Sequence, residues 1–134
     1  MVKLVFCIHR QPHLTHEEFL RYWLDEPGRL AISLVKDLRV RRYVQLHTIE
    51  TPLNDLFAAP RQALEPFDGI VELWFDSLEV VEEMIATRPG RRAGKLLLED
   101  ERNFIDLERS HIFFGREHEL IPPDTTAVSG GDGA

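Results

Sequence analysis

Cysteine and long apolar runs are almost absent from the sequence. Cys7 is the single cysteine, so no disulfide can form within the chain. No apolar segment approaches the ~20 residues that a membrane-spanning helix needs. Residues 1–6 lack the long apolar core and the small-residue cleavage site of a signal peptide. We therefore expect a cytoplasmic protein without a membrane partner.

An excess of basic residues is also missing. The sequence carries 23 acidic and 16 basic residues, which gives a formal net charge of −7. Nucleic acids and anionic membrane surfaces attract basic patches, so neither is an expected partner. This leaves a small molecule or another protein chain as the expected partner.

Motifs for cofactors and metals are lacking as well. We find no glycine-rich phosphate loop, no dinucleotide fingerprint and no Gly-x-Ser-x-Gly elbow. His9, His13 and His16 are close in sequence, but their spacing does not fit a zinc signature. We expect no metal site and, if the protein is an enzyme, chemistry without a cofactor.

The sequence does contain enough apolar residues for one core. Hydrophobic residues make up 43% of the 134 residues, which predicts one domain, placed at residues 1–120. Residues 121–134 are rich in proline, glycine, serine and threonine and have few apolar anchors. We expect them to form a disordered C-terminal tail.

Hydrophobic patterning indicates four strands. They lie at residues 3–9, 39–48, 68–76 and 107–115. Residues 50–67 hold three prolines, so we expect a long loop there, with room for a short helix at 53–64.

Helices are predicted between these strands. Thr15 and Glu18 match a capping box that begins the first helix, which we expect to kink or restart at Pro27. Ser77 is a good N-cap for a second helix that ends before Pro89. Residues 91–99 favour a further short helix.

The order of elements predicts a ferredoxin-like, split βαβ fold of the α+β class. We expect one four-stranded antiparallel sheet with helices on one face. The other face carries apolar and aromatic residues and needs a cover. A second copy supplies it by two-fold symmetry, so we expect a homodimer in which two sheets close into a barrel.

Four short motifs then follow one another in a recognisable order. They are residues 15–23, 43–45, 68–77 and 100–106, and they span most of residues 2–118. Together they resemble the EthD domain family of the dimeric α+β barrel superfamily. The resemblance implies relatives among cofactor-free isomerases, and among dehydratases or decarboxylases of aromatic polyketide pathways.

One motif departs from the family pattern. Members often carry Trp-x-x-x-His-Gly-Pro in the first helix, whereas here Trp23 is followed by Pro27 at the histidine position and by Arg29 at the last position. If that histidine moves protons in relatives, this chain uses another group or has lost the activity.

Candidate site residues lie on the second and third strands. Glu72 and Trp74 share a face of the third strand, and a half-buried glutamate is costly unless it is paired. Tyr43, Gln45 and His47 share a face of the second strand, and the resemblance turns Tyr43 toward the barrel interior. We expect the two groups to meet in one pocket, where Tyr43 orients a substrate oxygen and His47 or Glu72 moves a proton. A hydrated face of the sheet or a dimer interface would explain the same pattern of polar and aromatic residues.

His9 and His111 lie on neighbouring strands and project into one cavity if both face inward, which makes them further catalytic candidates. A structural role is the commoner one for each. Gln45, Trp74, Trp23 and Phe113 are the expected substrate-contacting residues.

Two functional hypotheses remain open. The first is an enzyme, an isomerase, dehydratase or decarboxylase, that acts without a cofactor on a small aromatic, lactone or polyketide-like molecule. The second is a non-catalytic dimeric ligand-binding or auxiliary protein of the same pathway. Pro27 in place of the family histidine favours the second hypothesis.

Overall fold

The structure, a computed structural model, describes residues 1–124; residues 125–134 of the predicted tail lie outside the described part. The elements are β1 (Val2–Ile8), α1 (His16–Leu38), β2 (Arg42–His47), α2 (Pro52–Ala58), β3 (Gly69–Phe75), α3 (Leu78–Ala86), α4 (Arg88–Glu101) and β4 (His111–Gly115), with short 3₁₀ helices at Ala59–Arg61 and Leu107–Arg109. Among the helices of residues 1–124, none is long and apolar enough to cross a bilayer.

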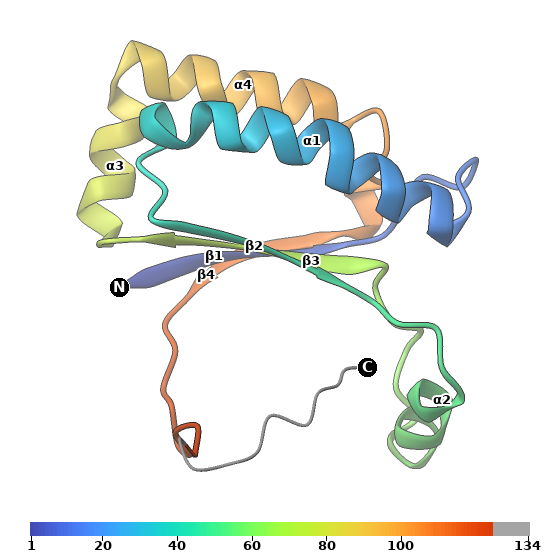
Figure 1. Ribbon diagram of the computed structural model, residues 1–134. Helices are drawn as coiled ribbons and strands as arrows, with labels where there is room; N and C mark the ends of the chain where they lie inside the picture. The colour runs from blue at the N-terminus through green and yellow to red at the C-terminus, as the bar shows by residue number, and fades with distance from the viewer. Residues whose placement is uncertain (125–134) are drawn as a thin grey trace.

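The four strands form one antiparallel sheet in the order β2-β3-β1-β4. Figure 1 shows α1, α3 and α4 on one side of this sheet, while α2 lies beyond its end on the opposite side. This confirms the predicted ferredoxin-like α+β fold. We call the side under the three helices the covered face and the other side the open face.

The core lies between the covered face and the helices. One cluster of buried side chains gathers around Phe75 and Leu38, and a second, more aromatic cluster gathers around Phe19, Trp23 and Phe104. The bulkiest fully buried side chains all belong to the second cluster. The second cluster therefore holds Trp23 firmly against the sheet.

Helix α1 continues through Pro27, so of the two expected outcomes, a kink or a restart, the restart does not occur. A proline has no N–H, so the carbonyl of Trp23, four residues earlier, loses its usual helical partner. Gln45 Nε2 on β2 donates to that carbonyl oxygen at 3.1 Å and replaces the missing bond. The capping box of Thr15 and Glu18 is present as predicted.

Two other boundaries differ from expectation, whereas the loop holds a short helix where the sequence left room for one. Helix α4 begins earlier than residue 91, because Pro89 occupies its first turn, where a backbone N–H has no helical partner to lose. Strand β4 begins only at His111, because a 3₁₀ turn precedes it. The expected loop contains α2, capped by Thr51, and no side chain of this helix is buried.

Gly69, at the start of β3, lies where a side chain has no room. A Cβ there would lie 2.4 Å from Cζ3 of Trp23 and 2.7 Å from the carbonyl oxygen of Leu46. Trp23 is 2% exposed and the Leu46 carbonyl is backbone, so the new contact is relieved only if the main chain shifts. We expect Gly69→Ala to lower the free energy of unfolding by about 2–3 kcal/mol, measured by urea denaturation.

The matched control is Gly115→Ala at the end of β4, where a new Cβ meets nothing within 4 Å. This variant should differ from the wild type by less than about 0.5 kcal/mol. Equal stability of the two variants would contradict the close contact between Gly69 and Trp23.

Candidate functional site

The sheet register separates the two groups of predicted site residues. Tyr43 pairs with Leu73, whereas Glu72 pairs with Val44 and Trp74 with Arg42. Directly paired residues of neighbouring strands point to the same face. Tyr43, Gln45 and His47 therefore lie on the covered face, and Glu72 and Trp74 on the open face. The prediction that they meet in one pocket is wrong.

Glu72 and Trp74 belong instead to a charged end of the open face. Lys3 Nζ lies 3.1 Å from Glu72 Oε2 and 2.7 Å from Glu117 Oε1. The Trp74 ring lies between two cations, with its centroid 4.9 Å from Lys3 Nζ and 4.5 Å from Arg42 Cζ. The partner that a half-buried Glu72 requires is thus a lysine.

The two strand histidines also lie around one open-face hollow, of about 740 Å³. The ring of Phe67 stands between them, with centroids 4.5 Å from His9 and 5.7 Å from His111. Phe113 is on the same face of β4, opposite Val5, and is 52% exposed. The sheet separates all of these side chains from Tyr43.

A different cavity, of about 290 Å³, lies between the covered face and the helices α1 and α4. Its wall is apolar for the most part, and the only ionisable side chains in it are Tyr43, Asp100 and Glu101. Trp23 and Pro27 line it as well. Pro27, which stands at the family's histidine position, thus contributes to the wall of this cavity.

Glu101 was not among the sequence-based candidates. It is the last residue of α4, it is half-buried, and burial, followed by the charge of Asp100, raises its pKa to about 7. A carboxylate at a helix C-terminus is unfavourable, because the helix dipole is negative there. The sequence did offer one signal for Glu101. It follows another acidic residue, Asp100, and lies just before Phe104 and Ile105, which are buried.

Gln45 fixes the orientation of Tyr43. The two hydrogens of Gln45 Nε2 go to the Trp23 carbonyl and, at 2.6 Å, to Tyr43 Oη. In the described part of the chain no acceptor takes the hydroxyl hydrogen of Tyr43, so this hydrogen is left for a ligand. Burial, with a smaller contribution from the charge of Glu101, raises the pKa of Tyr43 and keeps the phenol neutral.

His47 completes this polar row. Its Nε2 donates to Gln45 Oε1 at 2.8 Å, and its ring stacks on Trp23 at a centroid distance of 4.9 Å. Burial, and then the charge of His16, lowers the pKa of His47. His47 therefore acts at neutral pH as an uncharged group that holds the Gln45 amide.

An outer hollow of about 450 Å³ adjoins this row on the side of α1. Tyr43 lines both the cavity and the outer hollow, so its ring belongs to the wall between them. Arg29 is the one cation among the residues that line the outer hollow. Within residues 1–124 no carboxylate forms an ion pair with it.

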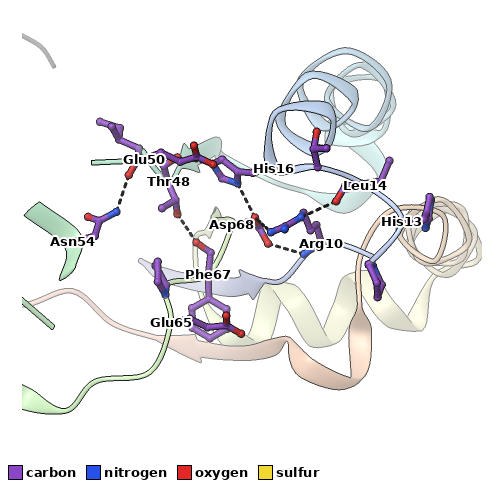
Figure 2. A pocket seen from close by; sticks show the side chains of 14 residues that line it. Arg10, His13, Leu14, His16, Thr48, Glu50, Asn54, Glu65, Phe67 and Asp68 are labelled. Atoms are coloured by element: carbon purple, nitrogen blue, oxygen red, sulfur yellow. Dashed lines mark hydrogen bonds and ion pairs between the residues drawn. The ribbon is translucent and has the colours of Figure 1, made fainter. Parts of the chain in front are cut away.

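Figure 2 shows a third hollow, of about 620 Å³, in which Arg10 and His16 point toward Asp68. Asp68 is 5% exposed and accepts from Arg10 N at 2.8 Å, Arg10 Nη1 at 2.9 Å and His16 Nδ1 at 2.6 Å. His16 Nε2 donates to the carbonyl oxygen of Thr48 at 2.8 Å. The His16 side chain is 14% exposed and is therefore held within this cluster.

This cluster has a structural role. Both ring nitrogens of His16 already have partners, so neither is free to take a proton from a substrate. Burial alone would raise the pKa of Asp68, but the hydrogen bonds from Arg10 and His16 outweigh it and keep the pKa below its usual value. The cluster ties the end of β1, the start of α1 and the start of β3 together.

The chain is similar to known proteins in both sequence profile and fold. The profile of the EthD domain matches residues 11–108. An EthD family protein from Bacillus halodurans has a TM-score of 0.58 at 19% identity, over 88% of this chain and 99% of that one. A protein from Arabidopsis thaliana has a TM-score of 0.57 at 15% identity, over 91% of this chain and 100% of that one.

A dimeric protein of unknown function with a ferredoxin-like fold, from Bacteroides fragilis, has a TM-score of 0.53 at 13% identity. The match covers 87% of this chain and 95% of that one. At these identities the likeness to solved structures shows the fold alone. No curated protein matches the sequence.

Asp68→Asn tests the structural role of the cluster. The variant places an amide NH₂ among donors and removes the charge that they share, so we expect a loss of about 3 kcal/mol at pH 7. In the wild type this contribution is present above pH 3.8 and is lost in acid, as the pH falls through the folded-state pKa. Urea denaturation at pH 7 measures the loss.

Asp76→Asn is the matched control. Asp76 is exposed and lies 3.5 Å from Arg41 Nε, so its replacement should cost less than about 0.5 kcal/mol. A similar loss in both variants would contradict the assigned role of Asp68.

Glu101 should make stability fall as the pH rises. Its pKa is 4.5 in an unfolded chain and about 7 in the fold, so the folded state binds more protons between these values and stability decreases across this window. We expect Glu101→Gln to remove this dependence and to be more stable than the wild type at pH 8, on the order of 2 kcal/mol. Thermal unfolding at pH 5 and pH 8 checks this; an unchanged pH dependence in the variant contradicts it.

Proposed function

The chain belongs to the EthD domain family, and from this premise we propose that it is a cofactor-free enzyme. It moves a proton within a small aromatic, lactone or polyketide-like molecule held in the cavity between the sheet and the helices α1 and α4. The reaction class is isomerisation, dehydration or decarboxylation in a catabolic or secondary-metabolic pathway.

One observation carries this proposal: Glu101 and Tyr43 line the same apolar cavity. A carboxyl group with a pKa of about 7 is present in both protonation states near neutral pH, which is what a proton-transfer group needs. Tyr43 has a hydroxyl hydrogen to spare, because Gln45 is the donor in their mutual hydrogen bond. That hydrogen is suited to the oxygen of a carbonyl or an enolate.

In this mechanism Glu101 removes a proton from the carbon next to a carbonyl group. The negative charge moves to the carbonyl oxygen, where the Tyr43 hydroxyl donates a hydrogen bond to it. Protonated Glu101 then returns the proton to a carbon of the same molecule, which completes an isomerisation without net gain or loss of protons. Gln45 and His47 act as positioning residues that hold Tyr43.

The homodimer forms part of this proposal. The open face leaves Phe113 and Leu46 more than half exposed, and a second copy is the cover we propose for it. The dimeric relative from Bacteroides fragilis supports it. Glu72, His9 and His111 would then lie at the subunit interface, away from Tyr43.

The alternative is a ligand-binding protein without catalysis. The observation in its favour is Pro27, which offers the cavity no acid–base group at the family's histidine position. Binding alone needs the apolar cavity but not Glu101. The two functions therefore differ in what the loss of the Glu101 carboxylate does.

The test uses 2-tetralone, an apolar two-ring ketone with exchangeable hydrogens beside its carbonyl. We expect the wild type to catalyse deuterium exchange at these positions in D₂O, followed by NMR, with a rate that rises as the pH passes through about 7. Glu101→Gln should slow the exchange at least ~100-fold, and Tyr43→Phe about 100-fold. Binding, measured by chemical-shift changes, should persist in both.

Glu99→Gln is the matched control, because Glu99 is exposed on the same helix; it should exchange at the wild-type rate. If 2-tetralone binds but the wild type exchanges it no faster than buffer does, the ligand-binding alternative is favoured. Exchange that survives Glu101→Gln would remove Glu101 from the mechanism.

A further inference from the structure

The charges around the cavity are all of one sign. Of the residues that line it, Asp100 and Glu101 are acidic, and none is a lysine, arginine or histidine. Glu101 also ends helix α4, so the negative end of the helix dipole lies at the same place. Nothing in this wall can pair with an anionic ligand.

We propose that the cavity selects ligands by charge: it admits neutral or cationic apolar molecules and rejects carboxylates. This inference deepens the proposed function and rests on it, because it takes the same cavity as the binding site. It assigns a substrate class in which the part of the molecule that reacts carries no negative charge, such as a ketone, a lactone, a neutral phenol or an amine. Of the proposed reactions it therefore retains isomerisation and dehydration and excludes decarboxylation.

The physical reason is desolvation without compensation. A carboxylate that leaves water for an apolar cavity loses its hydration and must find a cation or several donors in return. Here the Tyr43 hydroxyl is one donor, and a neutral carbonyl oxygen uses it equally well. An ionised Glu101 repels a second carboxylate and attracts an ammonium group.

The groups that face Glu101 support this charge pattern. Asp100 precedes it on α4 and takes a hydrogen bond from the Tyr22 hydroxyl of α1 at 3.2 Å. From β2 the facing group is the neutral phenol of Tyr43, whose pKa the charge of Glu101 raises further. No cation from α1, β2 or α4 offsets the two carboxyl groups within the cavity wall.

Three ligands of the same shape test this inference: 2-naphthamide, 2-naphthylmethylamine and 2-naphthoate. Their dissociation constants for the full-length protein are measured by NMR titration at pH 8, where Glu101 is mostly ionised. We expect the amide and the amine to bind about tenfold or more tightly than the carboxylate. Glu101→Gln should narrow the gap between amine and carboxylate, while Glu99→Gln leaves the ranking unchanged.

Gly94→Phe shows whether binding takes place in the cavity. Gly94 lies at the cavity edge, and a Cβ there meets nothing within 4 Å, so a larger side chain narrows the space. Binding of the amide and the amine should be lost in this variant, and Gly94→Leu replaces it if the phenylalanine variant does not fold.

Carboxylate binding as tight as amide binding, and lost in Gly94→Phe, overturns the inference. Failure of all three ligands to bind in a Gly94-dependent way overturns it too, together with the cavity as a ligand site. Failure of the proposed catalysis is a separate result, because it is measured by 2-tetralone exchange and leaves the charge ranking intact.

Discussion

Pro27 has no N–H to offer the Trp23 carbonyl, and the amide of Gln45 takes its place. The orientations of the Tyr43 and His47 side chains follow from this bond. The amide that reaches Trp23 also donates to Tyr43 and accepts from His47, so all three strand residues share one arrangement. The Trp23 carbonyl that Pro27 leaves without a helical partner thus fixes Gln45, which in turn orients the Tyr43 phenol.

The sheet divides the molecule into two chemical environments. The covered face combines an apolar cavity with Tyr43 and Glu101, whereas the open face combines cations, carboxylates and aromatic rings, as around Trp74. On the covered face the Tyr43 hydroxyl hydrogen has no acceptor among the described residues. On the open face the charged side chains around Trp74 are paired with one another. The proposed binding of a small molecule on one face and of a second copy on the other needs this division.

The fold was predictable because its signals are local and agree with one another. Thr15 and Ser77 start helices by capping, and the strands alternate as expected. The site was not predictable in the same way. Which face of β2 meets which face of β3 depends on register, and a shift by one residue reverses it. The burial of Glu101 depends on how α4 packs against α1, and the role of Gln45 depends on a proline 18 positions earlier; both are tertiary relations.

Helix α2 stands apart from this organisation. It has seven residues and buries none of them, so it adds little to the folding of the chain. Lengthening or shortening the connection between β2 and β3 would change mainly the entropy of closing a loop, which grows slowly with length. The segment is therefore a place where evolution can insert, delete or change contacts with another molecule while the part of the protein that forms the cavity stays as it is.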